Sequence, residues 1–329
     1  MKILVTGNAG FIGFHICKKL LERGDTVVGL DNLNPYYDID LKRSRLKILK
    51  KIAAKRKKKY FFFKIDISNI QRIKKIFTRH KFDRVIHLAA QAGVRYSLKN
   101  PEVYIKSNQV GFFNIIDLAC KFKVPHFVYA SSSSVYGDNP KMPFREQSNT
   151  DHPRQIYAAT KKSNELMAYS YSSLYRLKTT GLRYFTIYGP WGRPDMALFK
   201  FTKNILRKKK ITVFNKGNHQ RDFTYIDDAV NLTLLASDRI SHFNKKKTPF
   251  KIFNIGSNSP IKLNKFIKII EKILKIKARK KMFTLQKGDM VSTYSNSSKI
   301  FKKFNYIIKT NHCANIAKFI HWYKNYYLK

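Results

Sequence analysis

Short apolar segments alternate with longer segments of helical periodicity along the first half of the chain. Apolar runs predict six strands, at residues 2–6, 26–30, 60–65, 84–88, 126–131 and 180–184. Residues 11–23 and 155–174 carry apolar side chains at the three- and four-residue spacing of helices, and Gly24 is a typical helix-ending glycine. Because strands that alternate with helices form parallel sheets, this region predicts an α/β fold.

The alternation becomes less regular after Gly189. A loop rich in proline and glycine comes next, followed by a basic helix and then by an amphipathic helix over residues 263–276. We therefore expect a doubly wound parallel sheet of the Rossmann type over residues 1–188, and a smaller C-terminal α/β substrate-binding lobe over residues 189–329. Segments of the lobe are expected to interleave with the first domain.

Gly7, Gly10 and Gly13 lie between the first predicted strand and the first predicted helix. Gly7 would make the tight turn, Gly10 would let a pyrophosphate approach the backbone, and Gly13 would let the helix pack closely. The helix N-terminus carries a partial positive charge that favours the same anion. Asp31, at the end of the second strand, can accept hydrogen bonds from both ribose hydroxyls of NAD and would repel the additional phosphate of NADP. The pattern therefore predicts NAD as the cofactor.

Tyr157 and Lys161 lie four residues apart in a predicted helix, so both side chains lie on one face. The ordinary pKa of a tyrosine is about 10, and a neighbouring ammonium favours the phenolate that can act as a base. A run of serines at 131–134 ends a strand at the edge of the sheet where open α/β folds bind ligands. A surface tyrosine beside a solvated lysine is the alternative for the pair taken alone. The glycine turn and the serines favour a hydride-transfer site with its own acid–base group.

The composition limits the other possibilities. Hydrophobic residues make up 43% of the 329 residues, and no run of about 20 apolar residues could span a membrane. The first strand leads directly to the glycine turn, which leaves no room for a signal peptide. Cys17, Cys120 and Cys313 have no metal-ligand spacing and indicate a reduced, cytoplasmic protein without a metal.

The net charge is the one feature that suggests a different class of protein. The chain has 66 lysines and arginines against 20 aspartates and glutamates, for a formal charge of +46. Such a charge is typical of nucleic-acid-binding proteins. The basic residues are spread over the whole chain, however, and are mostly lysine, which lacks the rigid fork of arginine. We interpret the charge as compositional drift and expect neither a nucleic-acid nor a membrane partner.

These motifs, in this order, resemble those of the extended short-chain dehydrogenases/reductases, and more narrowly those of the nucleotide-sugar epimerases. The resemblance covers nearly the whole chain and includes the glycine turn, Asp31, residues 87–90, the serine run, Tyr157, Lys161 and residues 221–228. It implies that Ser132 takes the position of the catalytic serine or threonine. It also implies a homodimer formed through helices that flank the active site.

The other candidate residues follow from the same resemblance. It implies a cofactor site that contains Gly7, Gly10, Phe11, Ile12, Gly13, Asp31, Asn32, Asp66, Ile67, Leu88, Lys161 and Tyr184. It implies a substrate site that contains Arg95, Ser133, Ser134, Thr186, Arg193, Arg221 and Asp289. Arg221 would pair with the nucleotide diphosphate, and Asp289 would lie near the uridine ribose. Asp66 fits two roles equally well, a hydrogen bond to the adenine amino group or a cap on its own loop.

Two features of the sequence narrow the choice of reaction and substrate. The dehydratases of this superfamily carry an Asp-Glu pair directly after the catalytic serine or threonine, whereas Ser133 and Ser134 stand here and do not titrate near neutral pH. Residues 184–197 are similar to the signature of UDP-glucuronate 4-epimerases, in which the residues matching Thr186 and Arg193 hold the sugar carboxylate. Arginine binds a carboxylate through two parallel hydrogen bonds, which a neutral sugar does not require. A structural arginine packed on its own loop is the alternative for Arg193.

We therefore expect an NAD-dependent 4-epimerase that interconverts UDP-glucuronate and UDP-galacturonate through a 4-keto intermediate. Tyr157 would take the proton of the C4 hydroxyl, with Ser132 relaying or orienting it, and NAD would be regenerated in each cycle. A 4-epimerase of neutral UDP-sugars, such as UDP-glucose or UDP-N-acetylglucosamine, is the alternative among enzymes. A non-catalytic Rossmann-type nucleic-acid-binding protein is the alternative from another class.

Overall fold

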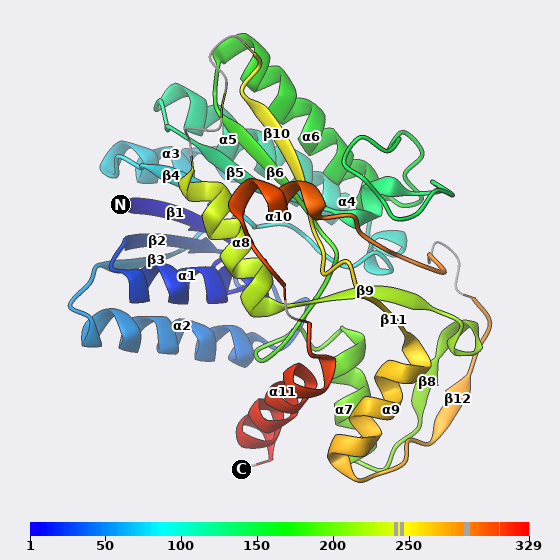
Figure 1. Cartoon of the computed structure of the whole chain (residues 1–329). Helices are drawn as coiled ribbons and strands as arrows, with labels where there is room; N and C mark the ends of the chain where they lie inside the picture. Colours follow the sequence, from blue (N-terminus) through cyan, green and yellow to red (C-terminus); the bar gives the residue numbers. More distant parts are fainter. Residues whose placement is uncertain (240–242, 244–246, 286–289, 309, 329) are drawn as a thin grey trace. The chain divides into compact units, whose positions relative to one another are not determined.

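The structure of the protein is a computed structural model that describes residues 1–239, 243, 247–285, 290–308 and 310–328 (Figure 1). The chain forms two compact units. The first contains Met1–Asn139, Ser148–Arg183 and Val230–Phe253, and the second contains Pro140–Gln147, Tyr184–Ala229 and Asn254–Lys329. Segments of each unit therefore interrupt the other along the chain, and they cross the predicted boundary at residues 188 and 189.

A seven-stranded sheet forms the centre of the first unit, in the order β10-β6-β5-β4-β1-β2-β3. The pairs β1–β2, β1–β4, β2–β3 and β4–β5 are parallel, which confirms the predicted doubly wound sheet. The strands are β1 (Lys2–Thr6), β2 (Thr26–Asp31), β3 (Tyr60–Lys64), β4 (Arg84–His87), β5 (Phe127–Ser132), β6 (Thr179–Tyr184) and β10 (Phe250–Ile255). The sequence pattern predicted six of these strands and missed β10.

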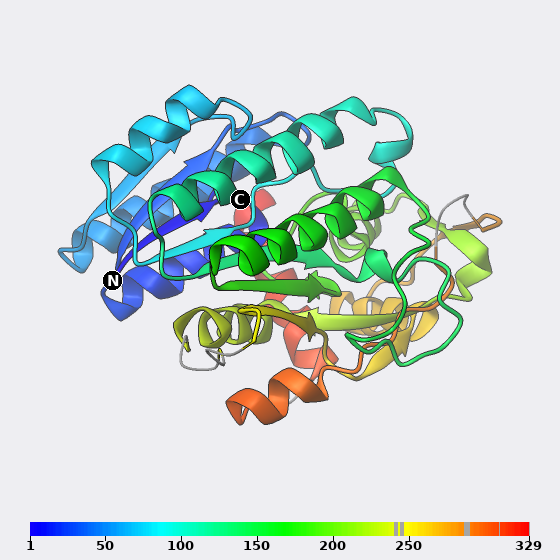
Figure 2. The same ribbon diagram turned by 90° about the horizontal axis from the view of Figure 1, so that it is seen from above.

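Helices cover both faces of this sheet, with α3, α5 and α6 on one face and α1 and α2 on the other (Figure 2). Phe77 of α3 and Phe112 of α5 pack in one core with Leu4, Val28 and Val85 of the strands. The helices are α1 (Phe11–Arg23), α2 (Ile39–Lys55), α3 (Ile70–Arg79), α4 (Glu102–Tyr104), α5 (Gly111–Lys121), α6 (Ile156–Tyr175) and α8 (Ile226–Asp238). Shorter turns are η1 (Tyr96–Leu98), η2 (Ile105–Val110) and η3 (Ser133–Tyr136).

The strand order reverses between β1 and β4. In an open α/β sheet the loops after two such strands diverge and leave a crevice at the carboxyl ends, where ligands bind. The glycine turn follows β1, and the segment that begins at Leu88 follows β4. The topology alone therefore places the candidate cofactor residues at a ligand-binding edge.

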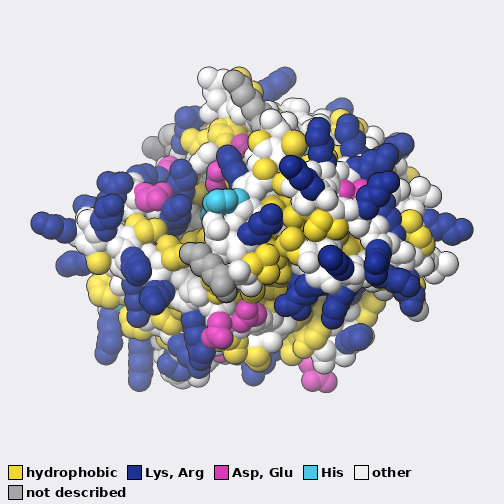
Figure 3. Space-filling view, turned by 90° about the horizontal axis from the view of Figure 1, so that it is seen from below, with side chains coloured by type: hydrophobic (Ala, Val, Ile, Leu, Met, Phe, Trp, Pro, Cys, Tyr) yellow, Lys and Arg dark blue, Asp and Glu magenta, His cyan; other side chains and the backbone are white. Residues whose placement is uncertain are grey.

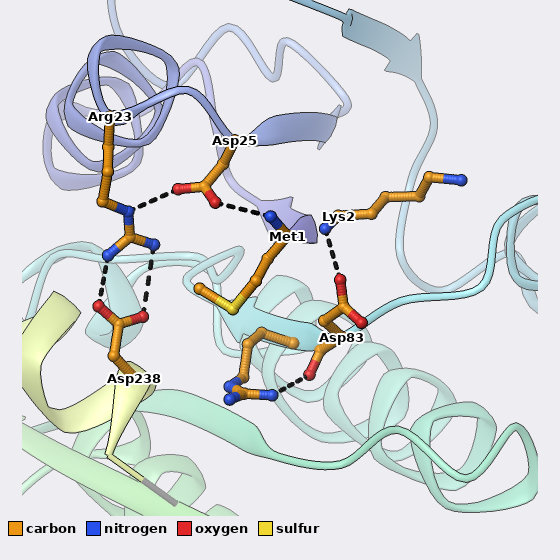
Figure 4. Close-up of polar contacts among 7 residues, drawn as sticks. Met1, Lys2, Arg23, Asp25, Asp83 and Asp238 are labelled. Carbon is orange, nitrogen blue, oxygen red and sulfur yellow. Dashed lines mark hydrogen bonds and ion pairs between the residues drawn. The ribbon is translucent and has the colours of Figure 1, made fainter.

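Ion pairs connect the beginning of this sheet to the end of α8 (Figure 4). The Met1 ammonium lies 3.0 Å from Oδ1 of Asp25, and Nε of Arg23 donates to Oδ2 of Asp25 over 2.6 Å. The same guanidinium pairs with both carboxylate oxygens of Asp238. The C-terminal end of α1 is thereby joined to a segment that is distant in the sequence.

The second unit contains a three-stranded sheet in the order β11-β9-β7 and the two-stranded pair β12-β8. Its elements are β7 (Thr186–Tyr188), α7 (Ala197–Leu206), β8 (Ile211–Val213), η4 (Phe214–Gly217), β9 (Gln220–Tyr225), β11 (Pro260–Lys262), α9 (Leu263–Leu274), β12 (Lys280–Met282), α10 (Ser298–Phe304) and α11 (His312–Tyr327). The rings of Phe223 and Phe266 stack with centroids 4.1 Å apart and join β9 to α9. The predicted amphipathic helix over 263–276 corresponds to α9.

On the face drawn in Figure 3, lysine and arginine side chains are scattered and do not gather in one stripe. On α2 most of them are exposed, among them Lys47, Lys50, Lys51 and Lys55, whereas Lys42 and Arg45 are buried, as are Leu46 and Leu49. The helix thus has an ordinary amphipathic pattern whose polar face is basic. In the described part of the chain, no helix is long and apolar enough to cross a membrane.

Candidate active site

The glycine turn joins β1 to α1 in a conformation that other residues would not tolerate. Gly7 has φ +71°, and a Cβ there would lie 2.8 Å from the Ala89 backbone nitrogen. A Cβ on Gly13 would lie 2.1 Å from the Gly7 carbonyl oxygen, so the helix approaches the turn as closely as its backbone allows. Gly10 is the N-cap of α1 and brings no capping side chain, within a segment that is fully described. The first N–H groups of α1 are therefore available to a pyrophosphate, and the turn fits this group.

Asp31 connects the end of β2 to the glycine turn. Its Oδ2 accepts a hydrogen bond from the Ala9 amide over 3.2 Å, and its Oδ1 accepts one from the Leu33 amide over 2.8 Å. The ammonium of Lys42 lies 3.9 Å from Oδ1, and both side chains are 8% exposed. Arg45, also on α2, donates to the Ala9 carbonyl over 2.8 Å. Sequence reasoning missed Lys42 and Arg45, because only the position of α2 brings them to the turn.

Asn32 and Asp66 lie together at the next strand end. Nδ2 of Asn32 donates to Oδ2 of Asp66 over 2.9 Å, and Oδ1 of Asp66 accepts from the amide and the hydroxyl of Ser68. Partial burial acts to raise the pKa of Asp66, but these hydrogen bonds and the charge of Lys106 outweigh it and lower the pKa. Asp66 therefore caps its own loop, and the predicted hydrogen bond to adenine stays a prediction.

The other predicted cofactor residues of the first unit lie at the start of α1 and in the segments that follow β3 and β4. Phe11 and Ile12 begin α1, and Phe11 is buried. The Leu88 amide donates to the carbonyl and the hydroxyl of Thr6, which joins the ends of β4 and β1. The Ile67 carbonyl accepts from Asn114 of α5 over 3.0 Å. These contacts fix the loop ends at the reversal of strand order.

Tyr157 and Lys161 lie one helical turn apart on α6, as predicted from their spacing. The Lys161 ammonium, only 3% exposed, donates to the Ala130 carbonyl of β5 over 2.7 Å. Ser132 is the last residue of β5, and its hydroxyl accepts from the Ser134 amide over 3.2 Å. The Tyr157 ring stands edge-on to the Tyr104 ring, with centroids 6.0 Å apart. The lysine and the serine thus lie at the carboxyl end of the same strand, beside the helix that carries the tyrosine.

Burial lowers the pKa of Lys161 to about 8, although the charge of Glu165 acts in the opposite direction. An ammonium in so dry a place exerts a stronger field than one in water. Glu165 lies one turn after Lys161 and accepts from the Ser131 hydroxyl over 2.5 Å and from both Nε and Nη2 of Arg183. This buried network was not predicted, although Glu165 continues the four-residue spacing of Tyr157 and Lys161.

Asn108 is a second residue that sequence reasoning missed. Its amide group exchanges hydrogen bonds with the backbone of Gln91 and donates to the Thr160 hydroxyl over 3.1 Å. It lies in the π-helical turn η2, so the insertion that forms this turn directs the side chain toward α6. No signal in the sequence distinguishes it from other asparagines.

His87 ends β4 without acting as a base. Its Nδ1 hydrogen-bonds the Thr6 hydroxyl at 2.9 Å, and burial together with the nearby Lys161 charge lowers its pKa to about 3. The imidazole is therefore neutral. No cluster of three or more histidine, cysteine or acidic side chains in the described ranges is placed to hold a metal.

The predicted sugar-facing residues of the first unit are partly accessible. Ser133 and Ser134 lie in the turn η3 directly after Ser132 and are half-buried. Arg95 precedes η1 and has an exposed side chain. Ser133 and Ser134 thus provide two hydroxyls directly after the end of β5.

The second unit holds the predicted carboxylate-binding residues. Thr186 begins β7, and Tyr184 ends β6 as a buried residue. Arg193 lies in the loop between β7 and α7, where its Nε and Nη2 donate to the two oxygens of Asp195 over 2.9 and 2.5 Å. Trp191 has φ +62° in the same loop, and its ring lies 5.2 Å from that of Trp322 on α11.

Arg221 lies on β9 and contacts a segment that the sequence also identified. Its guanidinium donates to the carbonyls of Met290 and Val291 over 2.6 and 2.8 Å. Asp289 lies outside the described residues, so its predicted place near the uridine ribose stays a prediction. Met290, the residue that follows Asp289 in the sequence, is thus a neighbour of Arg221.

Comparison with known proteins identifies the family of the chain. The model of the NAD dependent epimerase/dehydratase family matches residues 3–256. Protein CapI of Staphylococcus aureus is 47% identical over 340 residues, which is 100% of both chains. UDP-glucuronate 4-epimerase 2 of Arabidopsis thaliana is 45% identical over 339 residues, which covers 99% of this chain and 76% of that one. The crystal structure of UDP-glucuronic acid 4-epimerase from Bacillus cereus, in complex with UDP-glucuronic acid and NAD, matches with TM-score 0.90 and 32% identity over 99% of this chain and 100% of that one. The chain therefore belongs to the NAD dependent epimerase/dehydratase family.

Proposed function

We propose that the protein is an NAD-dependent 4-epimerase that interconverts UDP-glucuronate and UDP-galacturonate. The relatives named as UDP-glucuronate 4-epimerases support the reaction. The observation that carries the uronate assignment is the Arg193 side chain, which binds a carboxylate, that of Asp195, through two parallel hydrogen bonds. A side chain held in this geometry is a receptor for a carboxylate, and a neutral hexose offers it none.

The first unit supplies the acid–base chemistry. The Lys161 ammonium stabilises the Tyr157 phenolate, which takes the proton of the C4 hydroxyl. Ser132, at the end of β5, orients that hydroxyl. NAD, when bound, would supply the acceptor for the C4 hydride and the donor that restores it. Because the proton and the hydride both return, the reaction consumes no external reductant.

The assignment of NAD depends on two places at the carboxyl edge of the sheet, the turn after β1 and the end of β2. The uncapped N-terminus of α1 suits the pyrophosphate, and the Asp31 carboxylate suits the two ribose hydroxyls. Lys42 forms an ion pair with Asp31, with 3.9 Å between its ammonium and Oδ1. Asn32, Asp66, Ile67, Leu88 and Tyr184 complete the proposed site.

Each of two arginines in the second unit is assigned to one anionic group of the substrate. Arg193 and Thr186 hold the sugar carboxylate, and Arg221 pairs with the diphosphate. Asp289 lies near the uridine ribose. The 4-keto derivative of a uronate is a β-keto acid that loses carbon dioxide when its carboxylate is free to align. A rigid hold on the carboxylate therefore favours epimerisation.

We also propose that the protein is a homodimer that associates through α5 and α6. These neighbouring helices expose large apolar side chains, with Phe113 47% exposed, Leu166 58%, Tyr169 50% and Leu174 72%. Clustered apolar exposure of this kind is typical of protein interfaces. Light scattering should give twice the chain mass, and Leu166→Glu should give the monomer.

The decisive experiment is to incubate the purified protein with UDP-glucuronate, without added cofactor, and to separate the nucleotide sugars by chromatography. Formation of UDP-galacturonate would support the reaction, the uronate preference and the retained NAD together. Conversion of UDP-glucose alone would show that Arg193 has been misinterpreted. The Tyr157→Phe variant is the matched control, because it removes one hydroxyl and should give no product.

A further inference from the structure

Asp195 presents to Arg193 the same chemical group that a uronate carries. Nε of Arg193 donates to Oδ1 of Asp195, and Nη2 donates to Oδ2. The two side chains are 22% and 25% exposed, so water and solutes reach the pair. A bidentate pair of this kind occupies one edge of the guanidinium. The edge formed by Nε and Nη2 is thus taken by a residue of the loop itself.

The backbone around this pair is well fixed. The Gly192 amide donates to the Gly189 carbonyl over 3.1 Å, and the Met196 amide donates to the Arg193 carbonyl over 3.1 Å. Pro194, between the two partners, has a fixed φ. A change of partner at Arg193 is therefore a side-chain event that the loop permits without unfolding.

The base of the loop is packed on α11. Trp191 contacts Trp322 and Tyr326, with ring centroids 5.2 and 5.1 Å apart. The chain has two tryptophans in all, and both are in this contact. Intrinsic tryptophan fluorescence consequently reports on this loop and on the part of α11 that packs against it.

We propose that Asp195 is a specificity-determining residue that competes with the substrate carboxylate for Arg193. This inference rests on the proposed function. A uronate takes the Nε–Nη2 edge in exchange for Asp195, whereas a neutral hexose leaves the ion pair intact. Because one charge-assisted pair replaces another, the carboxylate contributes little net affinity, and both epimers of the uronate can leave the site.

The test compares binding to Asp195→Asn with binding to the parent, both in the full-length holoenzyme carrying Tyr157→Phe to prevent turnover. The asparagine side chain has nearly the same size as that of aspartate and carries no charge. The Kd for UDP-glucuronate, measured by tryptophan fluorescence and by calorimetry, should fall about threefold to tenfold, as expected for a partly exposed competing charge. The Kd for UDP-glucose should change less than about twofold.

The matched control is Asp138→Asn, which removes one carboxylate from an exposed pair with Arg154 in the first unit. It changes the net charge equally and should leave both Kd values unchanged. Asp195→Ser is a second variant, and thermal melting of each protein checks that it is folded.

Three results would overturn the inference. Weaker binding of UDP-glucuronate by Asp195→Asn would mean that Asp195 orients Arg193. An equal change for both sugars would mean that Asp195 only supports the loop, and no change for either would mean that no exchange occurs. Failure of the proposed function is recognised separately, because wild-type protein would then convert no UDP-glucuronate.

Discussion

The two units hold their candidate residues in different ways. In the first unit the backbone does so: Lys161 donates to the Ala130 carbonyl, and Asp31 accepts from two backbone amides. In the second unit Arg193 is held by the side chain of Asp195. Hydride and proton transfer tolerate little displacement, whereas recognition requires partners that can be replaced. Substitutions in the first unit should therefore change kcat, and those in the second should change KM.

The largest expected effect is that of Tyr157→Phe. Removal of the general base should lower kcat about 10³-fold and leave the KM for UDP-glucuronate within about twofold. The rate is measured by chromatography of the nucleotide sugars. Tyr169→Phe, an exposed tyrosine on the same helix, is the control and should retain its kcat. Equal rates for the two variants would contradict the assignment of the base.

Arg193→Ala tests whether the second unit controls substrate recognition. Loss of Arg193 would leave the carboxylates of the substrate and of Asp195 near each other without a cation, which should raise the KM for UDP-glucuronate and lower kcat/KM about 10- to 100-fold. The kinetics with UDP-glucose should not change. If both substrates lose activity equally, Arg193 is a structural residue and the second unit does not select for a carboxylate.

The pH dependence of kcat should report on Lys161. Its pKa is lowered to about 8, so the ammonium is present below that pH and is lost above it. Because only the ammonium supports the phenolate, kcat should fall about tenfold per pH unit once the pH exceeds about 8. Lys161→Arg, whose guanidinium keeps its charge, should remove this alkaline fall or move it upward. An unchanged fall in this variant would assign it to another group.

The smallest effect should come from Asp238→Asn, far from the chemistry. Loss of the pair with Arg23 should lower the free energy of unfolding by about 0.5–1 kcal/mol, because the pair is partly exposed. Thermal melting of the variant and the wild type in low and high salt measures this loss of stability, and high salt should reduce the difference between the two proteins. A changed kcat would mean that the scaffold of the first unit is coupled to its site more strongly than the contacts indicate.

Sequence spacing was sufficient to predict those site residues whose placement depends only on local backbone geometry. Four residues on a helix place Tyr157 and Lys161 on one face whatever surrounds them, and the positive φ of Gly7 is what a strand-to-helix turn requires. The helix boundaries of α1 were predicted correctly for the same reason, since Gly24 ends it in the left-handed conformation. The parallel character of the sheet followed from the alternation of strands and helices.

Residues that act through partners distant in the sequence were not predictable in this way. Asn108 reaches Gln91 and Thr160, and Lys42 reaches Asp31, only after the helices that carry them have packed. The Glu165–Arg183 pair joins α6 to β6 and leaves no pattern in either segment. β10 was missed because its position beside β6 is set by tertiary pairing after a lysine-rich stretch.

The scattered positive charge has a practical consequence for any preparation of this protein. A chain with a formal charge of +46 attracts polyanions without recognising their sequence. Cellular RNA that copurifies with it absorbs ultraviolet light in the same range as a dinucleotide does. An absorbance ratio would therefore overstate the amount of bound NAD. Nuclease treatment and a high-salt wash, followed by release of the cofactor and its identification by mass, would measure the true occupancy.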